Sequence, residues 1–115
     1  MPSRTDIKSG SFAVGSTETT PISLNEYALV GITSGSNLTA TSLTFQVSSD
    51  NVIWYPLFTD LGEYAITASS AVRAYALDPT AFMGWNLVKL RQGTSSSAVA
   101  QATATGLVTF LLRDM

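Results

Sequence analysis

Polar and apolar residues alternate strictly over residues 42–48, Ser-Leu-Thr-Phe-Gln-Val-Ser, and this period of two constrains the fold more than any other feature. Successive side chains of a β-strand point to opposite faces of a sheet, so the pattern predicts a strand with one buried face. The aromatic and β-branched run from Val52 to Phe58 predicts a second strand. Ser49-Asp50-Asn51 suits a tight turn between them, because Asp and Asn tolerate left-handed backbone angles. We therefore predict a β-hairpin over residues 42–58.

The rest of the chain repeats this pattern in short segments, with one exception. Asp78-Pro79-Thr80-Ala81-Phe82 has a capping residue followed by a proline, which predicts a single helical turn that ends at Gly84 and points Phe82 inward. Roughly eight or nine short strands at this spacing are typical of a sandwich or barrel. We predict an all-β fold, an antiparallel two-sheet β-sandwich of jelly-roll type with one helical turn near residues 79–83. Besides the hairpin, strands are expected at residues 12–14, 22–24, 27–33, 63–67, 73–77, 85–91 and 107–112.

Two segments fit this core less well. A chain of 115 residues has the size of one domain, which we place at residues 11–115, and the polar residues 1–10 predict a flexible N-terminal arm. Residues 93–106 are small and uncharged, which is compatible with a mobile surface loop or with a segment that orders against a neighbouring subunit. On the second interpretation, the representative contact residues are Arg4, Ile7, Thr94, Ser96, Val99 and Gln101.

Charged residues make up only 12% of the chain, about half of the roughly 25% typical of soluble domains. The six Lys and Arg residues are scattered and the net charge is -2, so we expect no nucleic-acid partner. Low charge favours close packing against neighbours. Neither an apolar signal-peptide core nor an apolar run long enough to span a bilayer occurs, so we expect synthesis in a reducing cytosol and no membrane partner.

The residue types that most often carry catalysis are missing. The chain has no His and no Cys, which removes the commonest general base and the usual zinc ligands. Most of the eight acidic residues fall at predicted turns or termini, where they serve backbone geometry and solubility. Asp50-Asn51 and Asp60 offer oxygen ligands, but without calcium-loop spacing the turn role is favoured. We expect no enzyme activity, no metal and no cofactor.

The aromatic residues suggest another kind of site. Trp54 and Tyr55 are neighbours on a predicted strand and must point to opposite faces. One interpretation places the tryptophans in the core and the tyrosines at its edges. The alternative is a stacking platform for sugar rings, with Tyr55 and Tyr64 as its glycan-binding residues.

Two segments resemble small virion proteins of tailed bacteriophages. Residues 44–57 contain an S-x-D-x-x-x-W turn followed by Pro56-Leu57, similar to a hairpin in those proteins. Residues 77–85 match L-D-P-x-x-F-x-G-W, and residues 89–95 match K-L-R-x-G-T-S, of the same proteins. Related hairpins often have Gly after the Asp, where Asn51 stands here, and Asn also accepts a positive φ.

The resemblance implies a β-sandwich of the capsid decoration or cement type, which binds the outer capsid surface and stabilises the shell. Its partners would be the major capsid protein and neighbouring copies of itself, as a homo-oligomer on the shell, and its location the virion. Two alternatives stay open: a carbohydrate- or receptor-binding module, and a neck or tail component of the virion.

Overall fold

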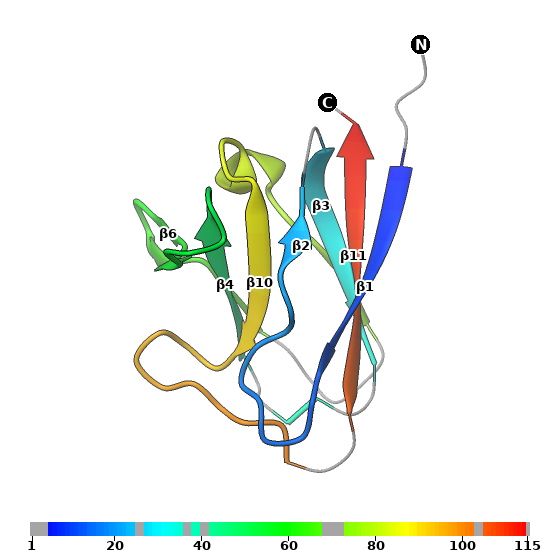
Figure 1. Ribbon diagram of the computed structural model, residues 1–115, viewed down its shortest axis with the longest axis vertical. Helices are drawn as coiled ribbons and strands as arrows, with labels where there is room; N and C mark the ends of the chain where they lie inside the picture. Colours follow the sequence, from blue (N-terminus) through cyan, green and yellow to red (C-terminus); the bar gives the residue numbers. More distant parts are fainter. Residues whose placement is uncertain are drawn as a thin grey trace.

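The computed structural model describes residues 5–24, 27–35, 38–39, 42–67, 73–102 and 105–114, and nearly all of its regular structure is β (Figure 1). One short 3-10 helix, η1, interrupts the strands, and no helix among the described residues has the length and apolar character needed to cross a membrane. The elements are β1 (Thr5–Phe12), β2 (Ile22–Ser23), β3 (Tyr27–Ser34), β4 (Ser42–Ser48), β5 (Tyr55–Pro56), β6 (Phe58–Thr59), β7 (Gly62–Glu63), β8 (Ala65–Thr67), β9 (Arg73–Ala76), η1 (Pro79–Phe82), β10 (Leu87–Gln92) and β11 (Gly106–Asp114).

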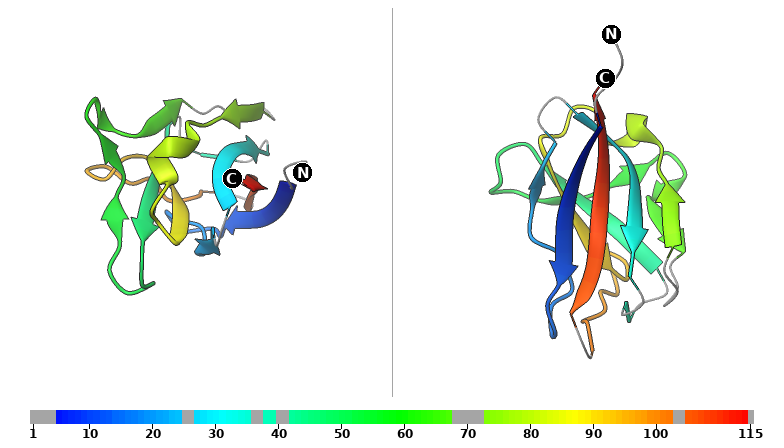
Figure 2. Two further views of the ribbon diagram at one scale, coloured as in Figure 1. Left: turned by 90° about the horizontal axis from the view of Figure 1, so that it is seen from above. Right: turned by 90° about the vertical axis from the view of Figure 1, so that its right-hand side faces the viewer.

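The strands form two main antiparallel sheets. One has the order β1-β11-β3-β9, and the other has the order β2-β10-β4-β5 with β8 also paired to β4. Along the chain, β1, β3, β9 and β11 lie in the first sheet while β2, β4 and β10 lie in the second, so the chain keeps crossing between sheets. This alternation is the jelly-roll arrangement, and it confirms the predicted β-sandwich. The views in Figure 2 show the first sheet on one side of the molecule and the hairpins of the second on the other.

The core lies between the two sheets because the alternating apolar residues of each sheet point toward the other. Phe110 of β11 and Phe45 of β4 are fully buried, and Phe82 of η1 lies 5.0 Å from Phe45, ring centre to ring centre, in an edge-to-face contact. A side chain at Gly10 of β1 would come within 2.7 Å of the Phe110 ring, so this glycine lets the ring pack against the strand. Such contacts fix the sheets as a rigid pair.

The predicted helical turn is confirmed. The Asp78 carboxylate accepts a hydrogen bond from the Thr80 N–H at 3.1 Å, Pro79 occupies the first turn, and Gly84 follows with a φ of +92°. Phe82 is buried as expected, which ties the turn to the core.

Two local expectations differ from the structure. Residues 5–10, expected in a flexible arm, form β1 and pair with β11 from Thr5↔Arg113 onward, while residues 1–4 lie outside the described residues. The expected strand over Val52 to Phe58 is broken, because residues 51–53 bend and only β5 and β6 are extended. The hairpin itself is present, with Val47 paired to Tyr55.

Candidate interaction surface

The turn between β4 and β5 is held by side-chain hydrogen bonds to its own backbone. One oxygen of the Asp50 carboxylate accepts from the N–H groups of Val52 at 2.9 Å and Ile53 at 3.0 Å. The buried Ser48 hydroxyl accepts from the Asn51 N–H at 3.0 Å and donates to Asp50. Asn51 has a φ of 61°, the positive value that the sequence anticipated. Because these bonds stabilise its ionised form, the pKa of the Asp50 carboxyl is lowered from its ordinary value.

A second turn joins β6 to β7, at the far end of the β5–β6 segment from the first turn. Phe58 pairs with Glu63 and Thr59 with Gly62, whose φ of +116° suits glycine. The Thr59 hydroxyl accepts a hydrogen bond from the Leu61 N–H at 3.2 Å. Seen from above, β5 and β6 run along one side of the molecule, with the two turns at opposite ends of that side (Figure 2, left).

These two turns expose large apolar side chains. Leu61 is 95% exposed and Val52 77%, although both lie in turns that are held by hydrogen bonds. Of the nine exposed large apolar side chains among the described residues, five fall within residues 52–61. We call this set the hairpin surface; it consists of Val52, Ile53, Tyr55, Phe58 and Leu61.

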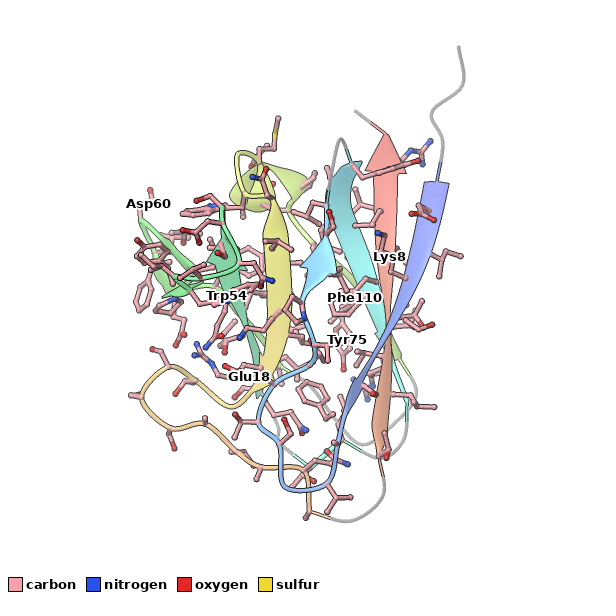
Figure 3. All side chains as sticks on the ribbon, viewed as in Figure 1. Lys8, Glu18, Trp54, Asp60, Tyr75 and Phe110 are labelled. Atoms are coloured by element: carbon pink, nitrogen blue, oxygen red, sulfur yellow. The ribbon has the colours of Figure 1, made fainter. Side chains whose placement is uncertain are left out.

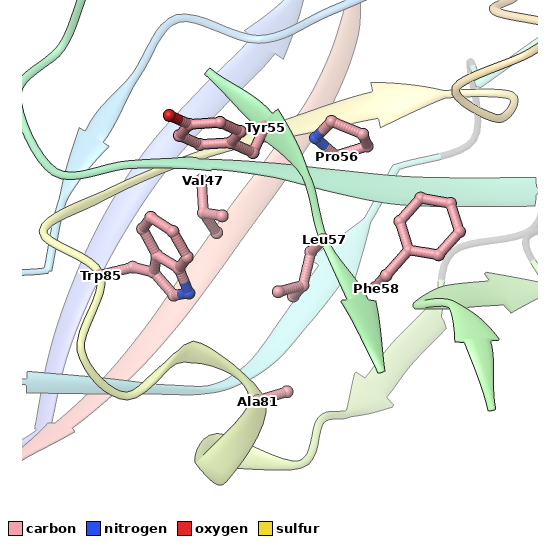
Figure 4. Close-up of a pocket in the computed structure, with 7 residues that line it drawn as sticks. All are labelled: Val47, Tyr55, Pro56, Leu57, Phe58, Ala81 and Trp85. Carbon is pink, nitrogen blue, oxygen red and sulfur yellow. The ribbon is translucent and has the colours of Figure 1, made fainter. Parts of the chain in front are cut away.

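A depression of about 400 Å³ opens between β5 and η1, next to the hairpin surface. Figure 4 shows Tyr55 and Trp85 at one side of it and Phe58 at the other. The Tyr55 and Trp85 rings are tilted, with centres 6.0 Å apart. The remaining lining residues are Val47, Pro56, Leu57 and Ala81, so the depression is mainly apolar.

Trp54 and Tyr55 point to opposite faces, as the strand geometry predicts. The Lys89 ammonium lies 4.3 Å from the centre of the Trp54 ring and forms a 3.2 Å ion pair with Glu18. Figure 3 labels Trp54 and Glu18 next to β10, the strand that carries Lys89. Tyr55 is 48% exposed at the depression. Only one of these two aromatic residues is therefore placed to contact a ligand there.

The second predicted glycan residue is not placed for sugar stacking. Tyr64 packs edge-on against Phe45 and Phe82, with ring centres 5.6 Å away in each case, and its hydroxyl accepts a hydrogen bond from the Asp78 N–H at 2.9 Å. Its ring belongs to the border of the core, so Tyr55 and Tyr64 do not form one platform.

The loop that follows β10 is fastened to its own domain. The Glu63 carboxylate forms a 2.8 Å ion pair with the buried Arg91 and accepts a hydrogen bond from the Ser95 N–H at 3.1 Å. The Arg91 Nε–H also donates to the Thr44 hydroxyl, which in turn donates to the Gly93 carbonyl at 2.9 Å. One end of the loop is thus held by a continuous polar network.

The other end of the loop is held by amide side chains. The Gln92 amide donates to the Gln101 carbonyl oxygen at 2.7 Å, and the Gln92 carbonyl oxygen accepts from the Thr39 N–H at 2.9 Å. The Ala102 N–H donates to the Thr39 hydroxyl at 3.0 Å. Hydrogen bonds therefore hold both ends of residues 93–102 to the domain, while residues 95–98 between them are exposed.

The predicted contact residues fall in different places. Ile7 is 61% exposed on β1, Ser96 is exposed, and Thr94 and Val99 are half-buried in the loop. Gln101 is only 1% exposed, so its side chain cannot serve as the surface contact that the sequence suggested. Arg4 lies outside the described residues. The structure does not bring these residues together into one surface.

Sequence reasoning missed the hairpin surface, apart from Tyr55. The signal was present, because apolar residues directly flank the turn residues Asp50-Asn51 and Asp60, where polar residues are the rule. Val52, Ile53 and Phe58 were instead assigned to one continuous strand, and Leu61 was assigned to no element. Among the described residues, no group of three or more acidic side chains is placed to hold a metal ion.

The fold defines a jelly-roll β-sandwich domain with an exposed apolar pair of turns. No family model and no curated protein matches the chain. Among solved structures, the SPBc2 prophage-derived protein YomS is similar with a TM-score of 0.57 and 11% identity, over 96% of this chain and 95% of that one. A protein of Bacillus endospore appendages, which form disulfide-linked pili, has a TM-score of 0.48 and 14% identity, over 98% and 88% of the two chains. At these identities, the likeness to the prophage-derived protein establishes a shared fold.

Proposed function

We propose that this chain is a non-enzymatic structural protein of a tailed-phage virion, which binds the outer capsid surface as a decoration protein. The observation that carries the proposal is the hairpin surface. Burying one large apolar side chain contributes about 1.5–3 kcal/mol relative to leaving it in water. Five such residues, exposed on two hydrogen-bonded turns and on β5 and β6 between them, favour a surface that a protein neighbour covers.

Two further observations support a phage particle as the setting. The segments 44–57 and 77–95 resemble virion proteins of tailed phages, and a prophage-derived protein has a similar fold. The turn Ser48–Trp54 that carries the first resemblance is the same turn that exposes Val52 and Ile53. The major capsid protein is the proposed partner, and many weak contacts on one shell would add up through multivalency.

The test mixes the purified chain with expanded phage shells that lack it and measures co-sedimentation and stoichiometry. The variant Phe58→Ser/Leu61→Ser removes two large apolar groups from the hairpin surface. Leu107→Ser is the matched control, because Leu107 is also exposed but lies on β11 in the other sheet. We expect the wild type and the control to bind at a fixed ratio and to raise the heat resistance of the shells, and the double variant to be lost from the pellet. Equal binding by all three proteins, or no binding by any, would reject the proposal.

A second candidate function is glycan binding at the depression. Tyr55, Phe58 and Trp85 offer aromatic faces around a volume that suits a sugar ring. A glycan array with the purified chain tests it, and Tyr55→Ala should abolish any binding found. Glycan binding that survives Tyr55→Ala would not come from this site.

Imaging of the particle separates a shell position from a neck or tail position.

A further inference from the structure

Strand β1 is the edge of its sheet, and one of its sides has no partner strand. Among the described residues, β1 pairs only with β11. Figures 1 and 2 show its upper half at the open border of the sheet. An edge strand of eight residues is a template for pairing with another strand.

The backbone groups on the open side can be assigned. The Ile7 N–H donates to the Asp6 carboxylate at 3.0 Å, so this N–H points away from β11. In an antiparallel pair, the N–H and C=O groups of alternate residues point to the same side. Thr5, Ile7, Ser9 and Ser11 therefore present their backbone groups to the open edge.

The side chains of β1 also alternate along the strand, between the outer face and the inner face of the sheet. Ile7, Ser9 and Ser11 are exposed on the outer face. Asp6 and Lys8 are half-buried on the face that also carries the buried Phe12. Lys8, labelled in Figure 3, has no ion-pair partner within the part of the chain that the structure describes.

We infer that β1 pairs antiparallel with β1 of a second copy of this chain, around a twofold axis at Ile7. In this register Ile7 lies opposite Ile7 of the second copy, and Thr5 lies opposite Ser9. These are the residues whose backbone groups face the edge, so each pair exchanges two hydrogen bonds. The Ile7 N–H then leaves the Asp6 carboxylate, to which it donates in the single chain, and this carboxylate turns to Lys8 of the second copy. Asp6 lies opposite Lys8 of the second copy, and Lys8 lies opposite its Asp6.

Charge complementarity selects this partner and this register. The 6↔8 pairs are of the type without backbone hydrogen bonds, in which side chains are closest, and opposite charges placed there stabilise the pairing. A parallel pairing in register would place Asp6 beside Asp6 and Lys8 beside Lys8, which is unfavourable. Asp6 and Lys8 thus favour antiparallel pairing with a second copy in this register, and they disfavour pairing with a strand that lacks the opposite charges. The product is one continuous sheet of eight strands with the order β9-β3-β11-β1-β1-β11-β3-β9.

Two kinds of variant test the pairing by sedimentation equilibrium of the purified full chain. Ile7→Pro removes one outward N–H, a change that edge strands tolerate, and should abolish dimerisation. Asp6→Lys and Lys8→Asp each create two like-charge contacts and should weaken the dimer by about tenfold. The double variant D6K/K8D restores both opposite-charge pairs and should dimerise like the wild type. Thermal unfolding followed by circular dichroism checks that every variant is folded.

Hydrogen exchange measured by NMR supplies the positional readout. The amides of Ile7 and Ser9 should exchange fast in dilute samples and become protected as the dimer forms. A wild-type chain that remains monomeric up to about 1 mM overturns the inference. So does a dimer that is insensitive to Ile7→Pro and to the charge changes, or one that Leu61→Ser dissolves. None of these results depends on binding to a capsid.

Discussion

At the level of single residues, Asp50 shows how a short polar side chain fixes the direction of apolar ones. Its carboxylate holds two successive backbone N–H groups, and the residues that carry them, Val52 and Ile53, point into solvent. The sequence indicated the turn and the positive φ of Asn51, because both follow from local chemistry. It did not indicate the exposure of Val52 and Ile53, since their type alone predicts burial.

The lowered pKa of Asp50 predicts a pH effect on stability. The group releases its proton more easily in the folded chain than in the unfolded one, whose ordinary value is 3.8. Its stabilising contribution is therefore present above that value and is lost as the pH falls through the lower folded pKa. We expect Asp50→Asn to reduce the decline of Tm on acidification in this range, measured by thermal unfolding. Asp60→Asn, in the neighbouring turn, is the control. An acid decline in Asp50→Asn identical to that of the wild type would contradict this role.

Phe82 and Phe58 form a matched pair for the contrast between core and surface. Phe82 is buried against Phe45 and Tyr64, so Phe82→Ala should lower the free energy of unfolding by about 3–5 kcal/mol. Phe58 is exposed on the hairpin surface, so Phe58→Ala should change it by no more than about 0.5 kcal/mol. Urea unfolding measures both. A large loss of unfolding free energy in Phe58→Ala would mean that this side chain stabilises the fold and is not reserved for a partner.

At the level of elements, prediction from sequence succeeded where side chains decide and failed where backbone pairing or distant contacts decide. β4 and β10 were evident because their apolar residues face the core at a period of two. β1 was mistaken for an arm because Thr5–Ser11 contains one large apolar residue, whereas its place is set by the ladder to β11. The attachment of residues 93–102 depends on Glu63 and Thr39, which are remote in sequence from the residues that they bind, Ser95 and Ala102.

The loop after β10 gives a prediction at this scale. Glu63→Ala removes the partner of the buried Arg91 and the acceptor of the Ser95 N–H. Leaving one member of a buried ion pair alone costs about 3 kcal/mol or more, and the loop loses its attachment to β7. We expect a lower free energy of unfolding and faster hydrogen exchange at the Ser95 amide. Slow exchange at Ser95 in this variant would show that other contacts hold the loop.

At the level of the whole molecule, the two sheets form a rigid body that offers two different surfaces. The hairpin surface lies on the side of β5 to β7, and the open edge of β1 borders the other sheet. A protein of this kind can contact a large partner with one surface and a second copy of itself with the other. That division of surfaces is how the proposed decoration protein would join a shell and connect its own copies on it.

The most direct test of this account is electron cryo-microscopy of the virion that contains the chain. The account predicts jelly-roll density on the outer shell, with Val52, Phe58 and Leu61 of the hairpin surface buried against a capsid subunit. Density in which the hairpin surface faces solvent, or which places the chain at a fibre tip with Tyr55 pointing outward, would contradict it.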